Sequence, residues 1–144
     1  MAKVNVYLGF DGNCEEAFNF YKSVFGGEFT YMGRYSDIPT TPGQPPINEA
    51  YKNKIMHVGL YISKETCIMG YDESMRELIK GNNFSLCVTP ANEEEARKLF
   101  DALAVGGKVT MPLEKQFWNA LNGMLIDKFG ITWMIDFPLE EPKY

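Results

Sequence analysis

Asn13-Cys14-Glu15-Glu16-Ala17 recurs seventy-nine residues later as Asn92-Glu93-Glu94-Glu95-Ala96, with four of the five positions identical. A short apolar run precedes each copy, and a double glycine follows each, at Gly26-Gly27 and Gly106-Gly107. Self-similarity over half of a short chain indicates two copies of one supersecondary unit. The sequence therefore predicts a fold with internal pseudo-symmetry.

The first copy lies within a pattern of one strand, one helix and three strands. Apolar residues alternate along Val4 to Phe10, which is typical of a half-buried strand. Asn13 with Glu16 is a variant of the capping box and predicts a helix start, and Gly26-Gly27 predicts its end. Further strands are expected at residues 28–35, 54–63 and 66–71.

The second copy predicts the same order. We expect a strand at Asn83 to Thr89 and a helix that Asn92 and Glu95 cap and Gly106-Gly107 ends. More strands are expected at 108–111, within 117–126 and at 132–137, with a turn at 127–130 and a helical turn in the linker near 75–79. The chain thus predicts one α+β domain over 1–144, with β-α-β-β-β modules at 1–74 and 82–138.

Composition narrows the class of protein. A chain of 144 residues with 45% hydrophobic content is sized for one compact domain. A net charge of -5 argues against a nucleic-acid or anionic-membrane partner, and no apolar run is long enough to span a bilayer. Cys14, Cys67 and Cys87 are odd in number and lack metal-ligand spacing. We therefore expect reduced, mostly buried thiols in a cytoplasmic protein.

One long irregular segment, Ser36 to Asn53, has no counterpart in the second module. Loops of this length in compact domains are commonly functional or mobile. A lid over a pocket, a flexible insertion and a dimer-contact arm remain open interpretations.

Several stretches carry a resemblance to a known family: Tyr7 to Ala17, Ile55 to Val58, Phe117-Trp118 and Asp127 to Ile135. Together with the paired β-α-β-β-β pattern, they resemble the PhnB-like branch of the vicinal oxygen chelate superfamily. This superfamily includes glyoxalase I, bleomycin-resistance proteins and extradiol dioxygenases. Members of the branch are sometimes labelled ubiquinone methyltransferases, but the sequence has no glycine-rich strand-to-helix turn for a nucleotide cofactor.

The resemblance implies a cup, because in this superfamily each module's sheet curls into half a barrel with its helix outside. It also implies a homodimer. Metal-dependent relatives place ligands on the first and last strands of each module, which carries over to Asn5, Met69, Asn83 and Met134. Amides and thioethers are poor ligands for divalent ions that prefer imidazole and carboxylate, while thioethers suit soft Cu(I). We therefore predict no metal centre of the family type and no cofactor.

Strand alternation assigns faces within this expected cup. The side chains expected to face the helices are those of Val4, Val6, Leu8, Phe84, Leu86 and Val88. The side chains expected to face the cup are those of Asn5, Tyr7, Asn83, Ser85 and Cys87.

Aromatic residues form the second group of candidates. An aromatic wall for a planar or apolar ligand is expected from Tyr7, Tyr61, Tyr71, Phe117 and Trp118, with core packing as the alternative. His57 is the only histidine. It is a candidate general base or ligand partner, although a structural histidine is the favoured interpretation because the sequence names no partner for it.

Charged residues are expected to be structural. Glu15-Glu16 and Glu93 to Glu95 stand in the first turns of the helices, where carboxylates complement the helix dipole. Arg34 is expected as a solvated surface charge, with contact to an anionic ligand as the alternative.

The leading hypothesis is metal-independent binding of a small apolar or aromatic molecule in the cup. Its proposed ligand-binding residues are Asn5, Tyr7, His57, Tyr61, Met69, Asn83, Trp118 and Met134. One alternative is a lyase, isomerase or dioxygenase that uses His57 or a non-standard metal site. Another is an interaction module whose own side chains fill the cup.

Overall fold

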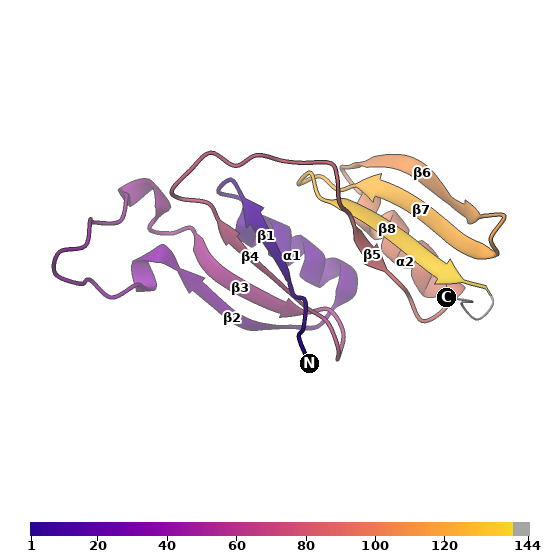
Figure 1. The fold of residues 1–144 in the computed structure, drawn as a ribbon, viewed down its shortest axis with the longest axis horizontal. Helices are drawn as coiled ribbons and strands as arrows, with labels where there is room; N and C mark the ends of the chain where they lie inside the picture. Colours follow the sequence, from indigo (N-terminus) through magenta and orange to yellow (C-terminus); the bar gives the residue numbers. More distant parts are fainter. Residues whose placement is uncertain (140–144) are drawn as a thin grey trace. The chain divides into compact units, whose positions relative to one another are not determined.

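Residues 1–139 are described by the computed structural model, and the chain divides into two compact units between Ile79 and Lys80. Each unit holds one four-stranded sheet and one α-helix (Figure 1). The strand order is β1-β4-β3-β2 in the first sheet and β5-β8-β7-β6 in the second, which is the same topology. The predicted α+β fold of two pseudo-symmetric βαβββ modules is confirmed.

The elements follow the predicted order in both units. The first unit contains β1 Val6–Phe10, α1 Cys14–Phe25, β2 Glu28–Arg34, β3 Ile55–Tyr61 and β4 Cys67–Asp72, with short 3₁₀ turns at Tyr35–Asp37 and Glu49–Tyr51 in the long loop. The second unit contains β5 Leu86–Val88, α2 Glu93–Ala104, β6 Lys108–Lys115, β7 Ala120–Ile126 and β8 Thr132–Pro138.

In each module the first strand pairs in parallel with the last, and the remaining neighbours are antiparallel. The helix connects the parallel edge strand to the strand at the opposite edge, so it crosses one face of the sheet (Figure 1). The sheet face without the helix is called the open face of that module below.

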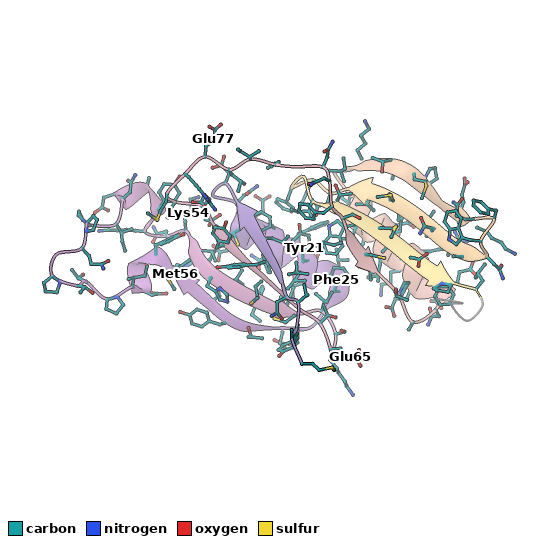
Figure 2. The ribbon with its side chains drawn as sticks, in the orientation of Figure 1. Tyr21, Phe25, Lys54, Met56, Glu65 and Glu77 are labelled. Atoms are coloured by element: carbon teal, nitrogen blue, oxygen red, sulfur yellow. The ribbon has the colours of Figure 1, made fainter. Side chains whose placement is uncertain are left out.

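The helix-covered face forms the core of each module. Helix α1 packs on β3 and β4, and its buried residues include Phe18 and Tyr21, the latter labelled in Figure 2. The Phe18 ring occupies the space that a side chain at Gly70 would need. Helix α2 packs on β6, β7 and β8 in the same way and buries Leu99 and Phe100. Because these faces take the apolar residues, the alternate positions on each strand are left for the open face.

Two strands begin later than predicted, so five residues that were assigned to strand faces lie outside the strands: Val4, Asn5, Asn83, Phe84 and Ser85. Strand β1 begins at Val6, opposite Ile68 of β4, so Val4 extends past its partner strand and is 96% exposed. Strand β5 begins at Leu86, and Phe84 is exposed as well. The sites assigned to Asn5 and Asn83 therefore lie outside the sheets, and both residues are exposed.

The helical turn expected near 75–79 is also absent from the structure that residues 1–139 adopt. Its apolar positions, Met75 and Ile79, are both exposed. A helix of one turn is unstable without a buried face to support it, and this segment of the first unit has none.

The two helices are capped differently, although the same sequence motif stands at the start of each. Asn92 caps α2 as predicted, since its side chain accepts a hydrogen bond from the Glu95 N–H at 2.8 Å. Asn13 makes no such bond. The Cys14 N–H instead donates to Oδ1 of Asp72 at 3.0 Å, fifty-eight residues along the chain. The predicted cap at Asn13 is therefore wrong, because a carboxylate from β4 replaces it.

Asp72 is only 1% exposed and joins three elements of the first module. Its Oδ1 accepts from the start of α1, and its Oδ2 accepts from the Ile55 N–H at the start of β3, at 2.8 Å. Nearby, Nζ of Lys54 (labelled in Figure 2) donates to the Gly12 carbonyl at 2.9 Å. These hydrogen bonds hold three segments around the first turn of α1: the end of β4, the start of β3 and the loop between β1 and α1.

Asp127 performs a comparable task in the second module and is 2% exposed. Its Oδ1 accepts from the backbone of Phe129 and Ile131, and its Oδ2 accepts from the indole N–H of Trp133 at 2.9 Å. The predicted role of Asp127 and Gly130 in a turn is confirmed, because the Gly130 N–H bonds to the Asp127 carbonyl and its φ is 86°.

We predict that Asp72→Ala lowers the free energy of unfolding by about 3 kcal/mol, because it leaves two buried N–H groups without their charged acceptor. Urea denaturation measures this loss. Asp101→Ala is the matched control, since Asp101 is exposed on α2 and its loss should change stability by about 0.5 kcal/mol at most. Equal stability losses in the two variants would contradict the role of Asp72.

Candidate functional site

The open face of the first sheet carries four of the eight predicted site residues, Tyr7, His57, Tyr61 and Met69. One row of register neighbours crosses all four strands, from Tyr7 on β1 through Met69 and Gly59 to Tyr31 on β2. Residues that pair directly across strands share a face of the sheet. Leu8 and Leu60, the next residues along β1 and β3, are buried on the helix side. The structure therefore places Tyr7 and Met69 together on the open face.

Four rings gather on this face, and they are called the Tyr7 cluster below: Tyr7, Tyr31, His57 and Tyr71. The Tyr7 ring meets His57 with centroids 5.6 Å apart and Tyr71 with centroids 4.9 Å apart, both edge to face. The Tyr31 and His57 centroids are 6.2 Å apart. Nδ1 of His57 lies 3.4 Å from the Tyr7 hydroxyl, within hydrogen-bond reach. His57 thus gains the neighbour that the sequence could not name.

Glycines make room for these rings against the sheet. The hydroxyl end of Tyr31 lies where a side chain at Gly33 would stand, and the Tyr71 hydroxyl would be 3.0 Å from a Cβ at Gly9. Any larger residue at Gly33 would displace the tyrosine ring. The cluster is therefore built into the sheet by residue size as well as by strand register.

The Tyr7 hydroxyl is a stable hydrogen-bond donor. Burial, followed by the neighbouring Tyr71, raises the pKa of the Tyr7 phenol above its ordinary value. Since that ordinary pKa is about 10, the phenol stays protonated at neutral pH. With His57 beside it, the cluster offers one phenol donor and one imidazole among apolar ring surfaces.

Tyr61 lies on the same sheet, at the end of β3, and is 47% exposed. It pairs with Cys67 of β4 and Glu28 of β2, one row beyond Tyr7 and Met69. Tyr61 is therefore at the edge of the open face.

The predicted residues of the second module separate from one another. Met134 lies on the open face of the second sheet, between Cys87 and Met124 in register. Trp118 lies in the turn between β6 and β7, beside Phe117, with ring centroids 4.8 Å apart. Phe117 is 96% exposed. These two rings belong to a hairpin tip and not to a sheet face, contrary to the aromatic wall that the sequence suggested.

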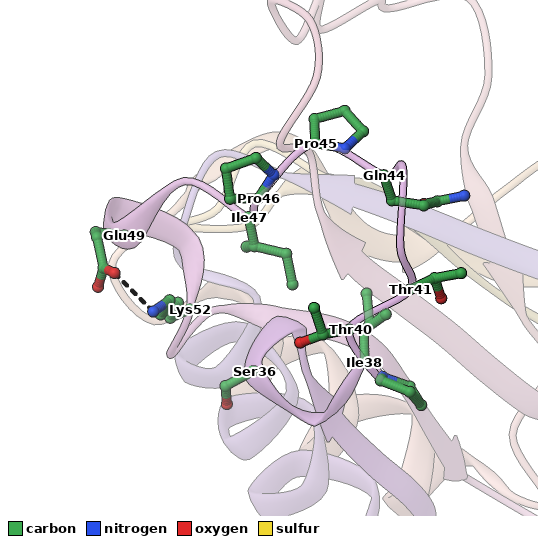
Figure 3. Close-up of a pocket in the computed structure, with 11 residues that line it drawn as sticks. Ser36, Ile38, Thr40, Thr41, Gln44, Pro45, Pro46, Ile47, Glu49 and Lys52 are labelled. Carbon is green, nitrogen blue, oxygen red and sulfur yellow. Dashed lines mark ion pairs between the residues drawn. The ribbon is translucent and has the colours of Figure 1, made fainter.

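The long loop encloses a hollow of its own. The hollow has a volume of about 470 Å³, and all of its lining residues come from the loop between Ser36 and Lys52 (Figure 3). Ile47 and Thr40 point into it, and Glu49 pairs with Lys52 at 2.6 Å on its rim (Figure 3). None of the Tyr7 cluster residues lines this hollow, so the two features are separate.

Arg34 is not the solvated charge that the sequence suggested. Its guanidinium holds Glu15 of α1 through two hydrogen bonds, at 2.6 and 3.1 Å, and also donates to the Asn53 carbonyl at 2.8 Å. The hydrogen bonds from Arg34 lower the pKa of the Glu15 carboxyl, and the positive charge of the guanidinium adds to this effect. Arg34 thus ties the helix to both ends of the long loop.

Among residues 1–139, no group of three or more His, Cys, Asp and Glu side chains is placed to hold a metal ion. Cys14 is buried at the start of α1, and burial raises the pKa of its thiol. The helices within the described residues are too short or too polar to cross a membrane.

The paired βαβββ modules define the class of protein. A glyoxalase-related enzyme from Fulvimarina pelagi and the fosfomycin resistance protein FosX from Listeria monocytogenes have the same fold, with TM-scores of 0.61 and 0.64. They are 16% and 9% identical to this chain, cover 95% of it in each case, and are themselves covered to 88% and 93%. The chain therefore has the glyoxalase/bleomycin-resistance fold.

Sequence comparison gives the family. A family model described as 3-demethylubiquinone-9 3-methyltransferase matches residues 2–136, and the chain belongs to this PhnB-like family. Protein PA1353 from Pseudomonas aeruginosa is 34% identical, with a TM-score of 0.82 and coverage of 96% of this chain and 98% of its own.

Two other relatives match over similar lengths. A PhnB protein from Bacillus cereus is 29% identical, with a TM-score of 0.76, and the match covers 94% of this chain and 99% of the relative. Protein YjdN of Escherichia coli is 28% identical, and the match covers 94% of this chain and 95% of the relative. The resemblance found in the sequence is thereby confirmed.

Sequence reasoning missed two residues around the site. Tyr31 was not assigned to a face because a β-bulge at Thr30 breaks the register between β2 and β3. Asp72 was missed because its partners, Cys14 and Ile55, are remote in the chain. An apolar strand that ends in a carboxylate was the one signal available for Asp72.

We predict that Glu15→Gln lowers the stability of the protein at pH 7 by about 0.5 kcal/mol, because both partners are partly exposed to solvent. Arg34 lowers the native pKa of Glu15, so this stabilisation is present above the ordinary carboxyl pKa of about 4.3. It should disappear as the pH falls through the lower native pKa.

Chemical denaturation between pH 3 and 7 measures this difference. Glu16→Gln is the matched control. Glu16 stands in the same helical turn, so its substitution removes a similar favourable interaction with the helix dipole. A gap between wild type and Glu15→Gln that does not narrow at low pH would contradict the proposed ion pair.

Proposed function

We propose that the protein binds a small apolar or aromatic molecule on the open face of its first sheet, and that this binding requires no metal ion. The observation that carries the proposal is the Tyr7 cluster, in which a phenol and an imidazole meet among aromatic rings on an uncovered sheet face. Tyr7, His57, Tyr61 and Met69 are the proposed binding residues. The proposal does not require the other four residues that the sequence suggested, which are Asn5, Asn83, Trp118 and Met134.

The chemistry of the cluster fits such a ligand. Rings on this face are partly accessible to solvent: Tyr7 is 53% and Tyr31 50% exposed, and His57 and Tyr71 are half-buried. Small-molecule sites commonly combine aromatic surface with a few placed polar groups. Met69, between Tyr7 and Gly59, adds a flexible thioether that adapts to irregular ligand shapes.

The proposed binding is non-covalent. The methyl transfer named in the family description is not part of the proposal, because the turn after β1, Asp11-Gly12-Asn13, has a single glycine. Nucleotide cofactors are held by glycine-rich turns of a different pattern. The homodimer and the single-domain organisation expected from the sequence stay predictions.

We predict that 4-nitrophenol and nitrobenzene both raise the melting temperature of the protein without added metal. A ligand at about one hundred times its Kd stabilises the native state by about 2.7 kcal/mol, which corresponds to a shift of several degrees. Differential scanning fluorimetry and isothermal titration calorimetry in the presence of a chelator measure this effect. If neither probe raises the melting temperature, the proposal is wrong.

Substitution of Tyr7 separates the polar contact from the ring surface. Tyr7→Phe keeps the ring and removes the hydroxyl, so 4-nitrophenol should bind about three- to tenfold more weakly while nitrobenzene is unaffected. Tyr51→Phe, which removes a hydroxyl from the long loop, is the matched control and should change neither affinity. If Tyr51→Phe weakens binding and Tyr7→Phe does not, the ligand occupies the loop and not the Tyr7 cluster.

A further inference from the structure

The open face of the second sheet carries sulfur on all four strands at one register position. Cys87 of β5 pairs with Met134 of β8, Met134 pairs with Met124 of β7, and Met124 pairs with Met111 of β6. These four residues are called the sulfur row below. The corresponding row of the first sheet contains a single sulfur, that of Met69.

The sulfur row faces away from the core. The neighbouring residues Trp133, Ile135 and Leu125 are buried on the side of α2. Because side chains alternate along a strand, the row lies on the opposite face. Cys87 is a free, exposed thiol, and the three methionines are half-buried.

The spacing allows several of these sulfur atoms to meet at one point. Neighbouring strands lie about 4.8 Å apart, and directly paired side chains have Cβ atoms about 5 Å apart. Methionine has three rotatable side-chain bonds and adapts its conformation readily. Three adjacent members of the row can therefore turn their sulfur atoms toward a common ion.

The next row along the same face is acidic. Asn122 of β7 pairs with Asp136 of β8 and with Glu114 of β6. Nδ2 of Asn122 donates to Oδ1 of Asp136 at 3.0 Å. Asp136 stands two residues beyond Met134 on β8, so its carboxylate lies on the same face of the sheet as the sulfur row. Two carboxylates beside a row of soft donors favour a cation over a neutral or anionic ligand.

We propose that the sulfur row binds one soft monovalent metal ion, Cu(I), through three adjacent sulfur atoms, the thioethers of Met111, Met124 and Met134. Thioether and thiolate groups select Cu(I), whereas Mg²⁺, Ca²⁺ and Mn²⁺ prefer oxygen donors. The ion binds as Cu(I) without a change of oxidation state.

The site is distinct from the ligand surface proposed for the first module. It uses methionine, a residue type outside the His, Cys, Asp and Glu groups among which the described residues form no metal cluster.

The test is an anaerobic titration of the full chain with Cu(I) in competition with bicinchoninate, followed by the visible absorbance of the Cu(I)–bicinchoninate complex. We expect the protein to withdraw one equivalent of Cu(I). Met124→Leu/Met134→Leu should weaken binding at least tenfold, a loss of about 1.4 kcal/mol. Leucine preserves side-chain volume, so the variant should fold as wild type does. Met32→Leu is the matched control: Met32 pairs with the buried Val58 on the helix-covered face of the first sheet, so its loss should leave the affinity unchanged.

A second measurement does not depend on the double variant. In protein labelled with ¹³C at the methionine methyl groups, Ag(I), a redox-inert substitute for Cu(I), should shift the signals of Met111, Met124 and Met134 but not that of Met32. Failure to withdraw Cu(I) from bicinchoninate would overturn the proposal. Equal affinity in the double leucine variant would also overturn it, because the ion would then be held by thiols alone.

Discussion

Side chains alternate across a β-strand, and each module covers only one face of its sheet with a helix. Every other feature depends on this constraint. Apolar residues such as Leu8 and Trp133 must face the helix to form a core, which leaves their neighbours Tyr7 and Met134 on the open face. The sequence can therefore change the chemistry of the open face without disturbing the core.

The two modules use this freedom differently. The first presents tyrosines and one histidine, and the second presents sulfur beside carboxylates. Their internal anchors also differ: Asp72 joins a helix start to two strands, while Asp127 organises the turn before β8. A duplicated unit thus keeps its strand order while its stabilising contacts and exposed chemistry diverge.

Local patterns were sufficient to predict the architecture. The repeated motif, the alternation from Val6 to Phe10 and the double glycines placed both helices and all the strands within a few residues. Contacts between distant segments could not be predicted in this way. The pairing of Arg34 with Glu15 depends on where β2 ends relative to α1, and no local periodicity encodes that distance.

The candidate site was predicted in part for the same reason. Strand parity placed Tyr7 on the open face, but its contact with His57 depends on the register of β1, β4 and β3. Trp118 was misplaced because an aromatic residue next to a strand has the same local pattern as one in a hairpin turn. Parity gives the face of a strand residue, and only register gives its neighbours.

The most direct measurement for this account is an NMR titration of the full chain with 4-nitrophenol, following backbone and aromatic signals. The account predicts that shifts concentrate at Tyr7, His57 and Met69, on the open face of the first sheet. Shifts confined to the loop hollow between Ser36 and Lys52, or to the helix-covered core, would contradict it.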